Sequence, residues 1–189
     1  MAKQRNDNKD GQRGDFYQAL VALKYALEYI EKPFNLISLE HFGDVTFDNF
    51  QQIEVKHHSP KGTLGDYHID FWKTLFNWCS KNNNFEKLIL HTTSSFPSTR
   101  SLLKSWNKQN KEEKLRTIKS LINSNTAEGV KIYMEFIDKM EEGTLKSIVE
   151  KIEIKTDQLN VSDRLTPSIN FQYAFLSLPA KRILWYIGH

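Results

Sequence analysis

Apolar residues recur at helical spacing near the start of the chain. They lie three or four positions apart, at Phe16, Leu20, Leu23, Leu27 and Ile30. This spacing predicts an amphipathic helix. Asp15 is a suitable N-cap for it, and Pro33 marks its end. The polar residues 1–14 contain two glycines and predict a flexible N-terminal arm.

Three short segments with strand chemistry follow this helix, at residues 36–40, 44–47 and 53–57. In the third, apolar and polar residues alternate with the two-residue period of a half-buried strand. Gly43 separates the first two segments, and Asp48 and Asn49 form a turn signal before the third. The pattern therefore predicts three consecutive short strands.

A second helix is predicted over residues 66–80, and a continuous apolar strand over residues 88–90. Helix-like spacing then recurs at residues 102–107, 115–122, 130–140 and 145–151, and an alternating strand-like segment follows at 152–155. The order helix, three strands, helix, strand predicts an α/β fold with a mostly helical C-terminal half. We expect one domain over residues 15–189, with a core at 15–95 and a helical extension at 98–189.

Composition supports a single domain with a real core, since the chain has 189 residues and 39% of them are hydrophobic. The one cysteine, Cys79, excludes an intrachain disulfide framework and favours a reducing compartment. The first residues lack the apolar stretch of a signal peptide, and no apolar run approaches the ~20 residues of a membrane helix. We therefore expect a cytoplasmic protein with no membrane partner.

Charge and aromatic residues add little by themselves. A net charge of +3 is too small to indicate a nucleic-acid partner. The densest basic stretch predicts a solvated helix face or, alternatively, a surface that contacts phosphates; it comprises Lys104, Lys108, Lys111, Lys114, Arg116 and Lys119. Trp72, Phe76 and Trp78 have helical spacing and are expected in the core rather than stacked on bases.

Candidate chemistry concentrates on the second and third strands. Side chains two positions apart share a face of a strand, so Glu54 and Lys56 lie on one polar face while Val55 faces the core. Asp44 is ten positions before Glu54, on the expected antiparallel neighbour. The acids meet only if the register between these strands is the right one.

The connecting loop determines that register. A two-residue loop would place Asp44 opposite Ile53, on the wrong face. A three-residue loop over residues 48–50 pairs Phe47 with Gln51 and therefore Asp44 with Glu54. We predict the three-residue loop or an equivalent bulge.

Two carboxylates at strand ends would make a hard oxygen site suited to Mg²⁺ or Mn²⁺. Such a metal activates water and stabilises charge on a scissile phosphate, and Lys56 could orient the water or neutralise phosphate oxygens. This is the PD-(D/E)xK arrangement of phosphodiesterases that cut DNA. The same triplet occurs at residues 112–114 and 153–155, but only Glu54 has an acid-bearing strand before it. The alternative is that Glu54 and Lys56 form a surface ion pair on an edge strand.

Several segments together resemble a known family; they are residues 14–18, 38–40 with Asp44, 52–58, 71–75 with Trp78, and 88–93. They are similar to the endonuclease domain of CBASS-type bacterial antiphage effectors, which is usually joined to a cyclic-oligonucleotide sensor called SAVED. Related nuclease domains occur in Lamassu-type and other defence systems. The resemblance covers roughly residues 11–95, and it implies a restriction-endonuclease-like fold and metal-dependent cleavage of double-stranded DNA.

The resemblance also implies roles for individual residues. Asp44 and Glu54 would hold the metal with help from the carbonyl of Val55, and Lys56 would be the catalytic lysine. Gln18 matches the family's helix residue that turns toward the site. Many relatives have Gln-x-Lys where this chain has Glu54, Val55 and Lys56, a difference that restores the standard carboxylate.

Other candidates are weaker. Glu40 is a further possible site acid by resemblance. His57, His58, His68 and Cys79 match no zinc-ligand spacing, and we expect His57 beside the active site or on a phosphate.

We expect a DNA endonuclease that serves as an antiphage effector. Because one such site cuts one strand at a time, we expect a homo-oligomer. Relatives carry a sensor for which 189 residues leave no room, so we also expect a regulatory domain or partner chain. One alternative is a non-catalytic interaction or sensor subunit of a defence complex with the same fold. Another is a restriction endonuclease with its own sequence specificity.

Overall fold

The structure is a computed structural model that describes residues 7–29, 36–39, 44–48, 50–58, 61–81, 84–124 and 127–158, with the side chains of the first helix described from Gly14 onward. The elements in chain order are α1 (Asp7–Glu28), β1 (Ile37–Leu39), β2 (Val45–Phe47), β3 (Gln51–Lys56), α2 (Ile69–Ser80), β4 (Lys87–Thr92), η1 (Leu103–Lys108), α3 (Lys111–Asn123), η2 (Glu128–Val130), α4 (Lys131–Asp138), α5 (Glu142–Lys151) and β5 (Ile152–Lys155).

The five strands form one mixed sheet with the spatial order β1-β2-β3-β4-β5. The pairs β1–β2 and β2–β3 are antiparallel, whereas β3–β4 and β4–β5 are parallel. The predicted α/β class and the order helix, three strands, helix, strand are confirmed. The segment at 152–155 is the fifth strand of the same sheet, so the sheet extends beyond the core boundary predicted at residue 95.

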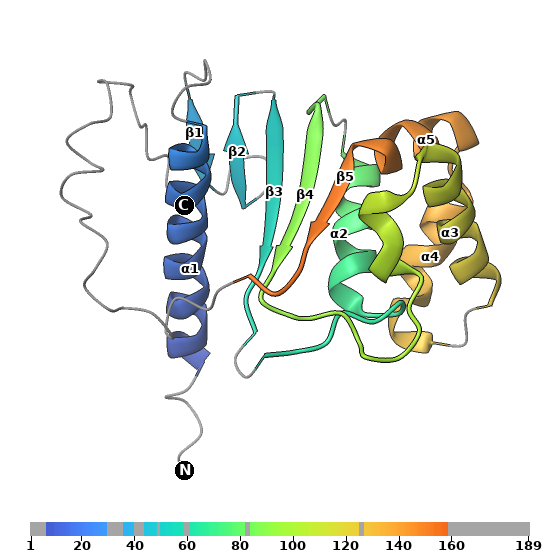
Figure 1. The fold of residues 1–189 in the computed structure, drawn as a ribbon, viewed down its shortest axis with the longest axis horizontal. Helices are drawn as coiled ribbons and strands as arrows, with labels where there is room; N and C mark the ends of the chain where they lie inside the picture. Colours follow the sequence, from blue (N-terminus) through green and yellow to red (C-terminus); the bar gives the residue numbers. More distant parts are fainter. Residues whose placement is uncertain are drawn as a thin grey trace, which may run out of the picture.

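Helices cover both faces of the sheet (Figure 1). One buried cluster joins α1 to β1–β3 through residues such as Tyr25, Phe47 and Ile53. A second, larger cluster joins α2 and the C-terminal helices to the opposite face of β4 and β5. Trp72 and Trp78 are fully buried in this second cluster, which confirms that they belong to the core.

Two helices begin at positions that differ from the sequence-based expectation. Helix α1 starts at Asp7, inside the segment expected as a flexible arm. Helix α2 starts at Ile69 rather than at residue 66, with His68 as its N-cap. The later start of α2 is explained by Asp66. Its carboxylate accepts hydrogen bonds from the Ser101 hydroxyl and from the backbone N–H groups of residues 102 and 103.

A side chain from η1 covers the outer edge of β5. The amide of Asn107 donates to the carbonyl of Ile154 at 2.7 Å and accepts from its N–H at 2.9 Å. The indole of Trp106 donates to the carbonyl of Ile152 at 3.1 Å. These contacts supply hydrogen bonds that a further strand would otherwise make.

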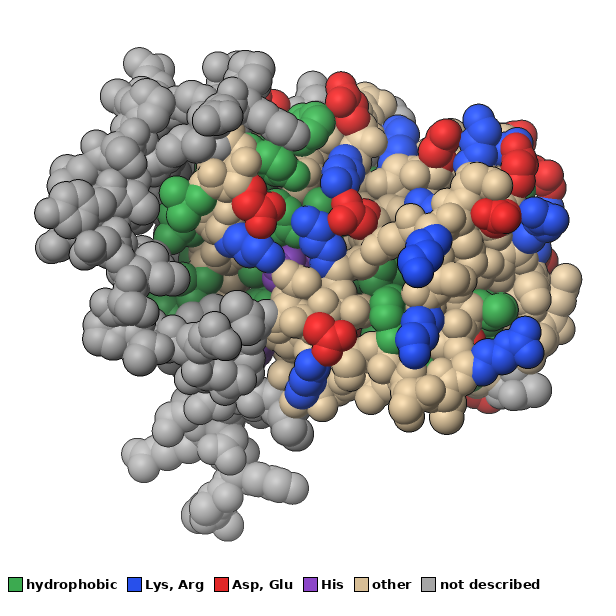
Figure 2. Space-filling model, viewed as in Figure 1, with side chains coloured by type: hydrophobic (Ala, Val, Ile, Leu, Met, Phe, Trp, Pro, Cys, Tyr) green, Lys and Arg blue, Asp and Glu red, His purple; other side chains and the backbone are tan. Residues whose placement is uncertain are grey.

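Three of the six basic residues at 104–119, namely Lys111, Lys114 and Lys119, contact acids or backbone of the helical half. Lys114 is buried, and its ammonium donates to the carbonyls of Ile152 at 2.7 Å and Glu150 at 3.3 Å. Lys119 pairs with Glu142. Figure 2 shows Lys and Arg side chains interspersed with Asp and Glu over the helical half. This distribution favours the solvated helix face over a phosphate-contacting surface.

Candidate functional site

The register between β2 and β3 is the one that brings the candidate acids together. Phe47 pairs with Gln51 and Val45 with Ile53, which confirms the predicted three-residue loop. Asp48 supports this loop with a positive φ of 44°, which Asp tolerates better than most residues. Continuing the ladder by one position places Asp44 opposite Glu54.

The carboxylate of Asp44 reaches the backbone of β3. Its Oδ2 atom accepts a hydrogen bond from the Val55 N–H at 2.6 Å. Because β2 begins only at Val45, the side chain of Asp44 takes over the position where a further strand residue would pair. Asp44 is therefore held at the carboxyl end of β3.

Glu54 and Lys56 form a short ion pair on that strand. The Lys56 Nζ atom lies 2.8 Å from Glu54 Oε1, and the Glu54 side chain is 9% exposed. Burial by itself would lower the pKa of Lys56, but the charge and hydrogen bond of Glu54, followed by the charges of Asp44 and Asp70, raise it above its ordinary value. Lys56 is therefore a cation at neutral pH.

The same interactions show that three acidic side chains lie near one lysine. The carboxylates of Glu54, Asp44 and Asp70 all act on the single ammonium of Lys56. The pair of Glu54 and Lys56 thus has two further acids, Asp44 and Asp70, near enough for their charges to act on Lys56.

A pocket of about 310 Å³ opens at this end of the sheet; it is lined by Gly14, Asp15, Gln18, Asp44, Val55, Lys56, His57 and His58. Gly14, Asp15 and Gln18 come from α1, Asp44 lies directly before β2, and the others come from β3 and the two residues after it. The structure thus brings four of the predicted site residues to one pocket, namely Gln18, Asp44, Val55 and Lys56. Glu54 does not line the pocket but contacts Lys56, which does.

The oxygen donors near the pocket are few. Within the described residues, no group of three or more His, Cys, Asp or Glu side chains is arranged to hold a metal ion. The ligand set expected from the sequence is the carboxylates of Asp44 and Glu54 with the carbonyl of Val55, and Asp15 is a further carboxylate that lines the pocket. Glu40, the weaker candidate, lies outside the described residues.

Asp70 is a site residue that the sequence did not reveal. It lies in the first turn of α2, and its Oδ2 atom is 2.5 Å from His58 Nε2. The same oxygen is 3.6 Å from His68 Nδ1. Helix α2 follows β3 in a parallel crossover, so its N-terminus lies at the edge of the sheet where β3 ends. That topological rule is the signal that could have pointed to Asp70.

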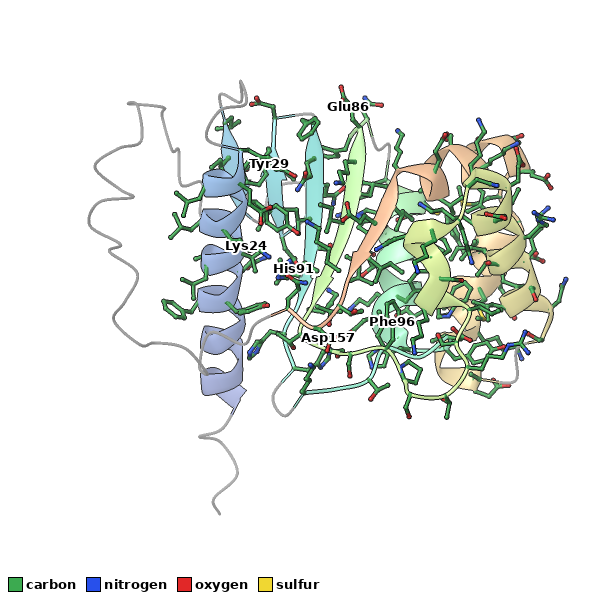
Figure 3. All side chains as sticks on the ribbon, in the orientation of Figure 1. Lys24, Tyr29, Glu86, His91, Phe96 and Asp157 are labelled. Carbon is green, nitrogen blue, oxygen red and sulfur yellow. The ribbon has the colours of Figure 1, made fainter. Side chains whose placement is uncertain are left out.

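A buried histidine fixes α1 against the sheet close to the pocket. His91 on β4 is 2% exposed, and its two ring nitrogens each lie 3.2 Å from a tyrosine hydroxyl of α1, on Tyr17 and Tyr25. Figure 3 places His91 on the sheet beside α1, where Lys24 also lies. The ring of Tyr17 is 4.7 Å from that of His57, which lines the pocket.

Burial sets the protonation state of this network. Burial, and after it the charges of Lys24 and Lys155, lower the pKa of His91 to about 3. Burial also raises the pKa of Tyr17 to about 12. His91 is therefore neutral at physiological pH, and one ring nitrogen donates to a hydroxyl while the other accepts from one.

The structure contains no helix, within the described ranges, that is long and apolar enough to cross a membrane. Comparison of the chain with protein-family models found no match. Comparisons with curated proteins and with solved structures likewise found none.

Proposed function

We propose that this chain is a metal-dependent endonuclease that hydrolyses phosphodiester bonds of double-stranded DNA. The observation that carries the proposal is the meeting of Asp44, Glu54 and Lys56 at the carboxyl end of β3, beside a pocket. Two acids and a lysine around one strand end are the groups that such hydrolysis needs.

The architecture supports the same proposal. An antiparallel trio of strands follows α1, and β4 returns beside β3 in parallel after α2. We propose that this sheet is a restriction-endonuclease-like PD-(D/E)xK core. By the same resemblance, we propose that the chain acts as an effector nuclease of antiphage defence, as a homo-oligomer or under the control of a sensor domain or partner chain.

The donor set fits a hard divalent cation. Carboxylate and carbonyl oxygens are the ligands that Mg²⁺ and Mn²⁺ prefer. In this proposal Asp44, Glu54 and the Val55 carbonyl hold the metal. Bound there, it would lower the pKa of a water molecule and stabilise charge on the scissile phosphate.

Lys56 and Gln18 would act directly on the substrate. Because the carboxylates around it keep Lys56 protonated, its ammonium donates hydrogen bonds and does not accept a proton. We assign it to the phosphate oxygens or to the attacking water. Gln18 faces the same pocket from α1, and its amide can both donate and accept there.

A second candidate function rests on a different property of the same residues. Glu54 already pairs with Lys56, and Asp44 already accepts from Val55, so these groups stabilise each other without any ligand. In a non-catalytic subunit with this fold, used for interaction or sensing, these contacts would have a structural role alone and would require no metal or substrate.

Incubation of plasmid DNA with Mg²⁺ or Mn²⁺, with and without EDTA, distinguishes the candidates. We expect the wild type to cleave only with metal and Lys56→Ala to be inactive. Lys131→Ala is the matched control, since Lys131 is exposed on α4 and pairs only with Glu128 within the described residues. Cleavage without metal, or a fully active Lys56→Ala, would overturn the nuclease proposal. Discrete fragments would favour a restriction endonuclease over a defence effector, which degrades DNA.

A further inference from the structure

His58 lies at the pocket in a fixed position. It is the second residue after β3, and it lines the pocket together with Asp44 and Lys56. Its backbone N–H donates to the Thr93 hydroxyl at 2.9 Å, and that hydroxyl lies 3.3 Å from the His58 carbonyl. Thr93 is almost fully buried at the end of β4. A loop residue tied in this way to the sheet has a well-defined side-chain origin.

The imidazole of His58 is also oriented. Its Nε2 atom lies 2.5 Å from Asp70 Oδ2, and the Asp70 side chain is only 14% exposed. A carboxylate that accepts from Nε2–H fixes the plane of the ring and leaves Nδ1 for a different partner, to which Nδ1 can donate only when the ring is an imidazolium. The carboxylate also offsets the charge of an imidazolium that binds an anion.

His58 and Lys56 share one electrostatic environment. Asp70, which contacts His58, is one of the three acids whose charge acts on Lys56. The imidazole that Asp70 orients thus borders the same cavity as the lysine assigned to phosphate. A DNA strand bound in this cavity would bring its phosphates to both residues.

His68 allows the structural role of Asp70 at the start of α2 to be tested separately from its contact with His58. Its Nδ1 atom accepts from the Asp70 N–H at 3.3 Å, and its ring lies 5.8 Å from that of His58. His68 therefore caps α2 and contacts the same acid, yet it does not line the pocket. It provides a histidine of the same cluster without access to the substrate.

We propose that His58 is a further substrate-binding residue of this site, that its doubly protonated ring donates from Nδ1–H to a phosphate oxygen of the bound DNA strand, and that Asp70 positions it by accepting from Nε2–H. The inference rests on the proposed nuclease function. It adds to that function a contact with DNA that Lys56, Asp44 and Glu54 do not make.

The test measures binding of a short fluorescent DNA duplex by anisotropy in EDTA, and cleavage of the same duplex with Mg²⁺. Variants are His58→Ala, His58→Gln, His68→Ala, Asp70→Asn and the double variant His58→Ala with Asp70→Asn. A lost hydrogen bond to a charged group corresponds to a Kd increase of about tenfold or more. We expect that increase for His58→Ala, and less than about twofold for His68→Ala.

The Asp70 variant tests the positioning role. We expect Asp70→Asn to weaken DNA binding in the same direction as His58→Ala, and to add nothing in the His58→Ala background. In the cleavage assay, we expect the KM of Asp70→Asn for the duplex to rise by a larger factor than its kcat falls. An Asp70→Asn effect that persists unchanged without His58 would show that Asp70 does not act through it.

The outcomes separate this inference from the proposed function. If the wild type cuts DNA and Lys56→Ala does not, while His58→Ala binds and cuts like the wild type, only the His58 assignment fails. If the wild type neither binds nor cuts DNA, both fail. Thermal melting by circular dichroism checks folding; should His58→Ala not fold, His58→Gln decides, because it loses the imidazole and keeps a group that can reach Asp70.

Discussion

His91 should make the stability of this protein depend on pH. In the unfolded chain its pKa is about 6.5, whereas in the folded protein burial and the nearby lysines lower it to about 3. Between these two values the unfolded chain binds a proton that the folded protein rejects. Stability is therefore complete above the unfolded pKa and is lost as the pH falls toward the folded one.

The expected size follows from the two pKa values. At pH 5, the unfolded state gains about 2 kcal/mol from protonation of His91, since each unit between pH and pKa corresponds to about 1.4 kcal/mol. The full effect, reached near pH 3, would be about 5 kcal/mol. Either value is a large part of the stability of an ordinary domain.

Urea unfolding at pH 7.5 and pH 5, followed by tryptophan fluorescence, measures this effect. We expect His91→Asn to be less stable than the wild type at pH 7.5 but to lose about 2 kcal/mol less between the two pH values. Tyr25→Phe is the matched control: it removes one hydroxyl partner of His91 and keeps the imidazole, so it should retain the wild-type pH dependence. An unchanged pH dependence in His91→Asn would refute the reasoning, because His91 would then titrate alike in both states.

Three further substitutions test other parts of the structure. Asp44→Asn should weaken Mg²⁺-supported cleavage about a hundredfold or more and leave the melting temperature nearly unchanged, because an amide oxygen can still accept from Val55; cleavage assays and thermal melts check this. Lys114→Met should cost about 1–3 kcal/mol in urea unfolding through the unpaired carbonyl of Glu150, whereas Lys146→Met, which breaks an ion pair with a half-exposed acid, should cost less than about 1 kcal/mol. Asp66→Ala should destabilise by about 2–4 kcal/mol in the same assay; a loss near zero would mean that its hydrogen bonds do not hold residues 101–103.

The parts of the fold that depend on local patterns could be predicted from the sequence. The two-residue alternation at Ile53 and Val55 indicated the strand, and the expectation that Asp44 meets Glu54 selected the three-residue loop, which the register of β2 and β3 confirms. The approach of Asp44 to β3 follows from that register. Local rules suffice here because both strands and their loop lie within about a dozen residues.

The rest depends on contacts between distant residues. The alternation at residues 152–155 indicated a strand, but not that it would pair with β4 across the whole helical half. The pattern also placed Asp66 inside a helix, because its bonds to residues 101–103 have no local signature. The contact of Asp70 with His58 joins a helix to a loop residue, and nothing in their spacing distinguishes Asp70 from other first-turn acids.

The cover that Asn107 places on β5 limits how copies of this protein can associate. Ile154 already has both backbone groups engaged by the Asn107 amide, so an incoming strand finds no free donor or acceptor there. Sheets that join edge to edge are a route to fibrils and to swapped dimers, and this edge is closed to both. Two copies of this protein that associate must therefore do so through surfaces other than the backbone of β5 at Ile154.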